Sequence, residues 1–463
     1  MVPQGGNRTR HWQALDAAHH IHPFSDSAAL NAEGVRVITR GDGIHLWDSD
    51  GRKFIDGLSG LWCVQVGYGN EELAEAGYAA LKTLSYYNHF FKTSNPWTIE
   101  LAAKLATILP AGHSRLLFAN SGSEANDAAL KLIRYYWNLK GRPAKKIHLS
   151  REYSYHGVTF AAASLSGLAP MHAQWDLPLP GFEKVPAPYW YGAKQAGYGD
   201  IAPAEFGLLI AGKLEEKILE LGPGNVASFS AEPVQGAGGL IFPPPTYWHE
   251  VQRICARYDV LLHLDEVITG FGRTGEWFGA QTWRIAPDIM TMAKGLSSGY
   301  QPISAVSLGQ RMADAIHDSH EELVHGFTTS GHPVACAVAS KNLDVIARLG
   351  LVPQVKTRTG PYLQRRLAET FCDHPIVGEV RGQGLLAAVE LVRDRKQRKF
   401  FPDPGTIGTL CRNYCLDEGL ICRAVRDTMV LAPPLVTRES EIDEIVAKLG
   451  TAIDRTAKDC GKL

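Results

Sequence analysis

One lysine of this chain follows directly on a short apolar run. Ile289-Met290-Thr291-Met292-Ala293 leads into Lys294, and a Gly/Ser segment, 295–299, follows it. Most lysines are solvated surface charges, but the run predicts a buried strand that carries this ammonium into a site with little water. Desolvation lowers the pKa of an ammonium, and the neutral amine is a nucleophile and a base. Lys294 is therefore a candidate catalytic residue.

A carboxylate is placed in the same way. Asp265 comes directly after the apolar run 260–264. An ionised carboxylate at the end of a buried strand is costly unless a cation or hydrogen-bond donors meet it. Loop amides could satisfy it, but at the carboxyl end of a parallel strand the usual partner is a ligand.

A Ser/Gly turn is the third candidate. The segment 120–127, with the sequence Asn-Ser-Gly-Ser-Glu-Ala-Asn-Asp, stands between an apolar run and a helical pattern over 128–136. Free backbone N–H groups, hydroxyls and the positive end of the helix dipole suit a phosphate. An ordinary N-cap by Ser123 is the alternative. A desolvated lysine, a buried acid and a phosphate cradle are together what pyridoxal phosphate (PLP) requires, because it carries an aldehyde, a pyridine nitrogen and a phosphate.

The elements that must position these groups alternate along the chain. Helical spacing predicts helices over 71–84, 97–109 and 246–258, and apolar runs predict strands at 115–118, 226–229, 260–264 and 289–292. Runs without alternation are typical of parallel strands covered on both faces. The fold class is therefore α/β, with a central, mostly parallel sheet.

Two outer segments differ from this pattern. Turn signals between short β-type runs at 30–60 predict a meander, and helices alternate with short runs from about residue 345 onward. We expect a large cofactor-binding domain over 70–344 and a smaller α+β domain. The C-terminal residues 345–463 form the smaller domain together with the N-terminal segment 1–69.

Composition excludes several classes of protein. The 47 Lys and Arg against 48 Asp and Glu leave a net charge of −1, which argues against nucleic-acid binding. No run approaches a membrane span, and residues 1–20 lack the apolar core of a secretory signal, so we expect a cytoplasmic protein. The eight cysteines form no CxxC pair, so no metal site is expected.

The chain resembles the class III aminotransferases, PLP-dependent enzymes of fold type I, and within them the ω-aminotransferases that use pyruvate as amine acceptor. The resemblance covers nearly the whole chain. It is carried by the segments 56–64, 121–124, 155–157, 232–239, 265–275, 293–295, 325–328 and 331–333. So many matches in the same order are far more specific than any one motif.

The resemblance implies a role for each cofactor residue. Lys294 would bind PLP covalently and move a proton between substrate and cofactor, and Asp265 would keep the pyridine nitrogen protonated. Tyr155 would stack on one ring face, with simple core packing as its alternative, and Val267 would press on the other. Glu232 would lie near the hydroxyl side of the cofactor.

The phosphate would be held by Gly122 and Ser123, joined by Thr328 from the neighbouring subunit. The active unit would then be at least a homodimer.

The resemblance also implies substrate residues. Phe24, Trp62 and Phe90 would wall the pocket, although each could equally pack at an interface. Arg423 matches a mobile arginine that binds the carboxylate of the acceptor, because a guanidinium fork suits a planar carboxylate; a surface ion pair is the alternative.

The implied reaction is a ping-pong transfer from a primary amine to pyruvate, which gives alanine. Candidate donors are diamines such as putrescine, β-alanine or taurine, and aryl-alkyl amines. A PLP-dependent aminomutase or racemase, or a non-enzymatic regulator, stays open as an alternative. The chain departs from the expected pattern at His263, Arg426 and Asp427, which leaves the electrostatics of the pocket open.

Overall fold

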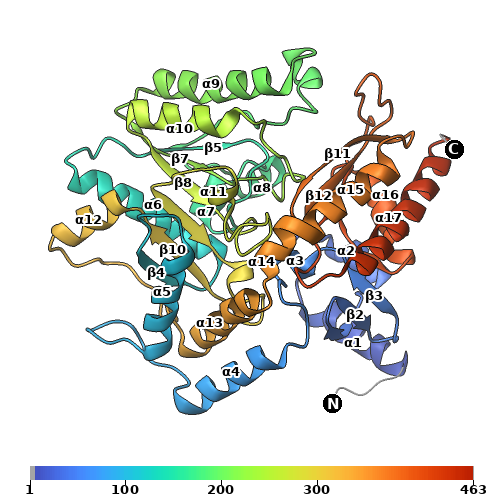
Figure 1. The fold of residues 1–463 in the computed structure, drawn as a ribbon, viewed down its shortest axis with the longest axis horizontal. Helices are drawn as coiled ribbons and strands as arrows, with labels where there is room; N and C mark the ends of the chain where they lie inside the picture. The colour runs from blue at the N-terminus through green and yellow to red at the C-terminus, as the bar shows by residue number, and fades with distance from the viewer. Residues whose placement is uncertain (1–5, 462–463) are drawn as a thin grey trace.

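The structure is a computed structural model that describes residues 6–461. Its centre is a seven-stranded sheet in the order β4-β10-β9-β8-β7-β5-β6 (Figure 1). The strands are β4 (Arg115–Ala119), β5 (Ile147–Arg151), β6 (Phe182–Val185), β7 (Val226–Ala231), β8 (Leu261–Asp265), β9 (Ile289–Met292) and β10 (Ser304–Leu308). Adjacent strands from β9 to β6 are parallel, whereas β10 is antiparallel to both β9 and β4. The predicted α/β class and mostly parallel sheet are confirmed.

The apolar runs form strands because both faces of this sheet are covered. Every residue of β7, β8, β9 and β10 is buried. Leu261 packs with α6 (Gly122–Leu139) on one face, and the next residue, Leu262, packs with α9 (Pro203–Leu221) and α10 (Tyr247–Tyr258) on the other. The period of two in a strand thus divides one apolar run between two helical layers.

Further helices surround the sheet or connect its strands. They are α4 (Glu71–Thr83), α5 (Pro96–Ile108), α7 (Phe160–Leu165), α8 (Ala169–Trp175), η1 (Lys194–Tyr198), α11 (Gly279–Thr282), η2 (Lys294–Leu296), α12 (Gln310–Asp318) and α13 (Pro333–Arg348). The predicted helices 71–84, 97–109 and 246–258 correspond to α4, α5 and α10 within two residues at each end. No helix in the described part of the chain combines the length and the apolarity of a membrane span.

The remaining strands form two four-stranded sheets, ordered β1-β2-β3-β13 and β11-β12-β15-β14. Their strands are β1 (Ile38–Asp42), β2 (His45–Asp48), β3 (Lys53–Asp56), β11 (Val377–Gln383), β12 (Leu386–Leu391), β13 (Leu420–Ile421), β14 (Arg423–Val425) and β15 (Thr428–Leu431). The helices of these terminal segments are α1 (Gly6–His19), α2 (Ser27–Glu33), α3 (Ser59–Trp62), α14 (Leu351–Gln354), η3 (Val355–Thr359), α15 (Gly360–Phe371), α16 (Thr406–Asp417) and α17 (Glu439–Asp459).

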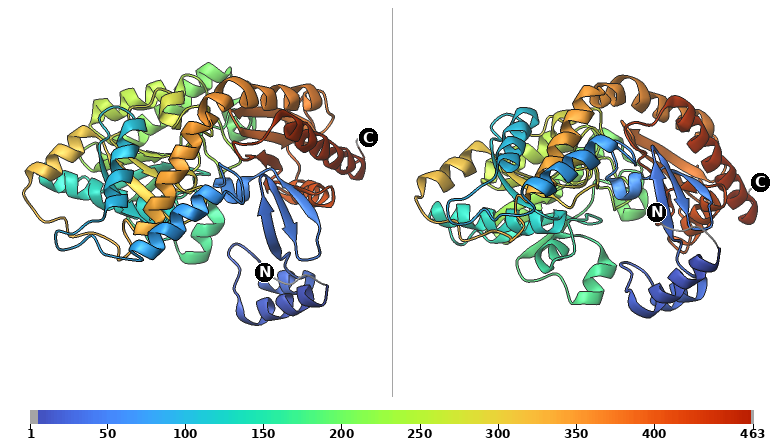
Figure 2. Two further views of the ribbon diagram at one scale, coloured as in Figure 1. Left: turned by 60° about the horizontal axis from the view of Figure 1, so that its bottom comes forward. Right: turned by 90° about the horizontal axis from the view of Figure 1, so that it is seen from below.

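The two ends of the chain meet in the first of these sheets. β13 pairs in parallel with β3, so that Leu420 lies opposite Ile55, and Figure 2 shows the N-terminal strands beside the C-terminal elements. The domain boundaries at 69/70 and 344/345 stay predictions. The second of them falls within the continuous helix α13.

Candidate active site

A cavity of about 320 Å³ lies where the predicted cofactor residues meet. Gly122, Ser123, Tyr155, Glu232, Asp265, Val267 and Lys294 all line it. These residues come from the ends of several strands and from the N-terminus of α6, which the parallel sheet brings to one edge. Of the residues that we associate with the cofactor, Thr328 alone does not line the cavity of its own chain.

Lys294 lies just beyond β9, at the start of η2. Its backbone is left-handed, with φ of 44°, a conformation that a residue with a side chain rarely adopts and that is often found at functional sites. Burial lowers the pKa of Lys294, although the carboxylates of Asp265 and Glu232 oppose this shift. The side chain therefore has the reactivity expected of a nucleophile and base.

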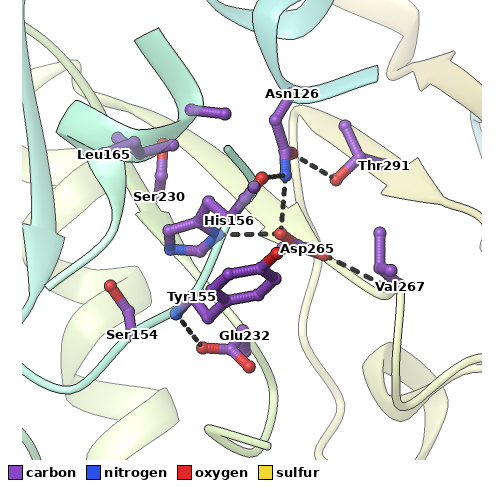
Figure 3. A network of polar contacts seen from close by, with 12 residues as sticks. Asn126, Ser154, Tyr155, His156, Leu165, Ser230, Glu232, Asp265, Val267 and Thr291 are labelled. Carbon is purple, nitrogen blue, oxygen red and sulfur yellow. Dashed lines mark hydrogen bonds and ion pairs between the residues drawn. The ribbon is translucent and has the colours of Figure 1, made fainter. Parts of the chain in front are cut away.

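Asp265 ends β8, and hydrogen-bond donors surround its buried carboxylate (Figure 3). His156 Nδ1 lies 2.7 Å and Asn126 Nδ2 lies 2.9 Å from Oδ2, while the backbone N–H of Val267 donates to Oδ1. Burial alone would raise the pKa of Asp265, but the hydrogen bond and charge of His156, with Asn126, hold it below its usual value. The carboxylate is thus ionised and can pair with a cationic ring nitrogen.

The N-terminus of α6 forms one end of the cavity. Ser121, rather than Ser123, is the N-cap and accepts from the backbone N–H of Glu124. The backbone N–H groups of Gly122 and Ser123 therefore belong to the first turn, which has no intrahelical acceptors. Ser123 Oγ accepts from Val158 N and keeps its own hydrogen to donate.

Glycine is required beside this turn for reasons of space. A Cβ on Gly122 would come within 3.3 Å of Val267, and one on Gly157 would lie 2.8 Å from the Ser123 Cα. Gly157 also has φ of 133°. Glycine at these two positions therefore allows Val267 and the 155–157 segment to pack closely against the turn.

Glu232 organises the wall that carries Tyr155. One carboxylate oxygen accepts from the backbone N–H of Tyr155 at 3.1 Å, and the other accepts from Gly236 at 2.9 Å. Burial raises the pKa of Glu232, and the positive field of His156 and Arg151 opposes this effect. The Tyr155 ring lies in front of the Asp265 carboxylate in Figure 3.

Arg423 and Trp62 lie together near this cavity. Trp62 is buried beside Ile268, which lines the cavity, and the Arg423 guanidinium lies 5.0 Å from the centre of its ring. The charge of Arg423 also acts on Lys294 and Tyr155. No carboxylate of the described residues forms an ion pair with Arg423, so the surface ion pair that we considered is not formed.

Three predicted residues lie elsewhere in the single chain. Phe24 is exposed and lines a separate apolar cavity with Val158 and Phe160. Phe90 and Thr328 lie in an exposed region where Phe90 packs at Gly326 and Tyr86 donates to the carbonyl of Thr328. None of the three lines the cavity around Lys294.

The three unusual residues also have defined places. Arg426 and Asp427 line a different cavity, where Arg426 lies over the rings of Tyr153 and Tyr189. His263 is buried in β8, two residues before Asp265. None of them lines the cavity around Lys294.

Sequence reasoning missed three residues around Asp265. Asn126 and His156 contact the carboxylate, and Thr291 contacts Asn126. A signal for Asn126 is its position four residues after Gly122, which puts both on one helix face. His156 follows Tyr155 within a segment that carried the resemblance, but neither it nor Thr291 had a local sign of its partner.

The donors of this cavity fit PLP. They comprise a desolvated amine for the aldehyde, an ionised carboxylate for the pyridine nitrogen and free N–H and hydroxyl groups at a helix N-terminus for the phosphate. A side chain at position 122 would meet Val267, so glycine keeps this part of the cavity free of one.

Comparisons with known proteins agree with this arrangement. The family model "Aminotransferase class-III" matches residues 28–453. The putrescine–pyruvate aminotransferase of Pseudomonas aeruginosa is 49% identical over 97% of both chains, and the diaminobutyrate–2-oxoglutarate transaminase of Halomonas elongata is 44% identical over 95% of this chain and 93% of its own. The crystal structure of the ω-transaminase from Pseudomonas jessenii in complex with PMP superposes with a TM-score of 0.94 at 42% identity, covering 97% of this chain and 99% of that one. The chain therefore belongs to the class III aminotransferases, PLP-dependent enzymes of fold type I.

Proposed function

We propose that this enzyme transfers the amino group of a primary amine to pyruvate, giving alanine and an aldehyde or ketone. The observation that carries this proposal is the 49% identity, over 97% of both chains, to a putrescine–pyruvate aminotransferase. One site serves both halves of a ping-pong reaction, because the amine and the keto acid meet the same Lys294.

The residues of the cavity have distinct roles in this proposal. When bound, PLP supplies a carbonyl that accepts an amino group and a ring that accepts electrons from the substrate carbon. Lys294 holds the cofactor and then moves the proton at the substrate carbon. Asp265 keeps the pyridine nitrogen protonated, because its ionised carboxylate pairs with the N–H of the ring.

The other cavity residues orient the cofactor. Tyr155 and Val267 would contact the two faces of the cofactor ring, and Glu232 positions Tyr155 through its backbone N–H. Gly122 and Ser123 bind the phosphate with first-turn N–H groups and a hydroxyl.

Arg423 supports a monocarboxylate acceptor. It is half-buried, has no ion-pair partner among the residues that the structure describes, and lies close enough to affect the pKa of Lys294. A guanidinium there can bind one carboxylate in bidentate fashion. Lys294 is the sole Lys or Arg in the described lining of the cavity, and Arg423, which lies beside it, is the one cation that we assign to the carboxylate of the acceptor.

For the donor we propose a diamine of the putrescine class, with β-alanine, taurine and aryl-alkyl amines as the other candidates. Trp62 supports an apolar chain between the two amino groups, since it lies beside Arg423 and Ile268. Phe24 and Phe90 would complete the pocket from segments that lie outside the cavity in one chain.

We also propose a homodimer in the cytoplasm. Thr328 would complete the phosphate site of the neighbouring subunit. The two segments that meet there, 86–91 and 323–328, carry exposed apolar side chains, namely Tyr87, Phe90, Phe91, Leu323 and Val324. Such a patch is typical of an interface. The cytoplasmic location rests on the composition of the chain.

A panel of donors tests the function. Purified holoenzyme is incubated with each amine and either pyruvate or 2-oxoglutarate, and alanine or glutamate is measured. We expect alanine formation to be fastest with putrescine. Faster transfer to 2-oxoglutarate would contradict the proposed acceptor. Turnover of an amine without any keto acid would favour the aminomutase alternative, which the transaminase relatives do not support.

A further inference from the structure

We propose that His263 is a positioning residue for Asp265, to which a directed chain of hydrogen bonds through Thr291 and Asn126 connects it. This inference rests on the proposed role of Asp265 toward the cofactor. It concerns the ring nitrogen rather than the choice of amine or keto acid.

The chain consists of buried side chains on adjacent elements. His263 Nδ1 lies 3.0 Å from Ser230 Oγ on β7, and its Nε2 lies 3.3 Å from Thr291 Oγ1 on β9. Thr291 Oγ1 lies 2.8 Å from Asn126 Oδ1, and Asn126 Nδ2 lies 2.9 Å from Asp265 Oδ2. Figure 3 shows the last two of these links.

The direction of every bond follows from the carboxylate. Ionised Asp265 can only accept, so Asn126 must turn its NH2 toward it and its carbonyl oxygen toward Thr291. Thr291 then donates its one hydroxyl hydrogen to Asn126. It can only accept from His263, whose Nε2 must carry the proton, and Ser230 must donate to Nδ1.

His263 can serve as such a donor because its ring is neutral. Burial lowers the pKa of His263 to about 3, so at neutral pH the ring has one N–H and one bare nitrogen. A ring with both roles fits between the Ser230 donor and the Thr291 acceptor. Asn126 Nδ2 also donates to the backbone carbonyl of His156 at 2.5 Å, so Thr291 fixes only the carbonyl end of this side chain. An apolar residue at position 263 would leave the Thr291 hydroxyl free to turn, and the Asn126 carbonyl oxygen would lose the contact that holds it in place.

The orientation of Asn126 affects the protonation of the pyridine nitrogen through the pKa of Asp265. Hydrogen bonds to the charged carboxylate lower its pKa and keep the shared proton on the pyridine nitrogen. Of the side chains around Asp265, His156 and Asn126 supply these bonds. Loss of the ordered Asn126 contact would make Asp265 more basic and draw the proton away from the ring.

The chain offers a matched control whose serine partner lies on the same strand, β7. His148 of β5 is also buried, its pKa is also lowered by burial to about 3, and its Nδ1 lies 2.8 Å from Ser228 Oγ, two residues before Ser230. Its Nε2 accepts from Arg134, and no described hydrogen bond joins His148 to Thr291 or Asn126. His148→Leu therefore removes an equivalent buried imidazole without cutting the path to Asp265.

The experiment compares His263→Leu, His263→Gln and His148→Leu as holoenzymes. The apoproteins are reconstituted with PLP whose pyridine nitrogen is isotopically labelled. The nitrogen NMR shift and the rate of the reaction with amine alone are then measured. We expect His263→Leu to move the shift toward the unprotonated value and to slow the reaction about threefold to tenfold, the effect of one hydrogen bond. His263→Gln, which can still donate to Thr291, should restore both values, and His148→Leu should leave both near wild type.

Equal shifts in His263→Leu and His148→Leu, or no rescue by His263→Gln, would overturn the inference. Should His263→Leu fail to fold, Thr291→Val removes only a hydroxyl from the same path and must give the same shift. Asp265→Asn distinguishes a failure of the proposed role of Asp265 from a failure of the proposed role of His263. If it leaves the nitrogen shift unchanged, the role of Asp265 itself fails. If it changes the shift while His263→Leu does not, only the role of His263 fails.

Discussion

The guanidinium of Arg423 lies 5.0 Å from the centre of the Trp62 ring, and the two side chains meet beside the cavity that contains Lys294. Stacking on an aromatic ring can hold a guanidinium in place while its N–H groups stay available to another partner. Among the described residues no carboxylate pairs with Arg423, so its N–H groups are available for the substrate role that we propose.

Arg423→Ala is therefore expected to discriminate between acceptors. The kcat/KM with pyruvate should fall about tenfold to hundredfold, the range for a hydrogen bond to a charged group, and that with a simple aldehyde should fall much less. Steady-state kinetics with both acceptors measure this. Arg426→Ala is the matched control, because Arg426 lines another cavity and should affect both acceptors equally. If Arg423→Ala lowers kcat/KM equally for pyruvate and for the aldehyde, its role as a carboxylate ligand is contradicted.

Lys294→Ala is expected to abolish transfer and to retain part of the cofactor binding, since the phosphate and ring contacts remain. In the wild-type enzyme, borohydride reduction followed by peptide mapping should find the cofactor attached to Lys294. Lys184 provides an internal control. Its pKa is also lowered, by burial, to about 7, but it donates to Ser150 and to the carbonyl of Ser164 outside the cavity. Attachment to Lys184, or an active Lys294→Ala variant, would defeat the assignment.

Mixed dimers test whether Thr328 completes the partner's site. Thr328→Asp should prevent phosphate binding by charge repulsion, and Lys294→Ala is inactive for a different reason. A dimer with one subunit of each kind has one intact site only if Lys294 and Thr328 act across the interface. Random mixing should then restore about a quarter of the wild-type activity. If the mixture stays inactive although mass spectrometry detects mixed dimers, Thr328 does not reach across.

Buried neutral histidines predict a loss of stability in acid. Burial lowers the pKa of His148 to about 3 in the folded state, against an ordinary value of 6.5. The unfolded chain therefore binds more protons between these values, so stability is full above pH 6.5 and falls as the pH decreases. Each such histidine lowers the free energy of unfolding by about 1.4 kcal/mol for every pH unit of acidification within this window.

His148→Leu removes one titrating group and should reduce the dependence of the thermal midpoint on pH below 6.5. Thermal unfolding of wild type and variant across that range measures the slopes. The exposed His11 is a control position, and His11→Leu should keep the wild-type slope. Identical slopes for wild type and His148→Leu would show that the imidazole is not held neutral.

The sequence by itself determined the α/β class, the mostly parallel sheet and the position of Lys294 and Asp265 at strand ends. Apolar runs such as 289–292 predict strands of a parallel sheet that is covered on both faces, and the residue that follows such a run lies at the edge of the sheet. The turn at Gly122 is local in the same sense, because the helix that follows creates its free N–H groups.

Only the tertiary structure decided which side chains surround those groups. Asn126 and Asp265 are 139 residues apart, and their contact depends on how α6 lies across β8 and β9. The pairing of β3 with β13, like the stacking of Arg423 on Trp62, joins the two ends of the chain, and Phe24 lies outside the Lys294 cavity in a single subunit. Spacing along a chain reports local periodicity, whereas these contacts depend on the packing of whole elements against one another.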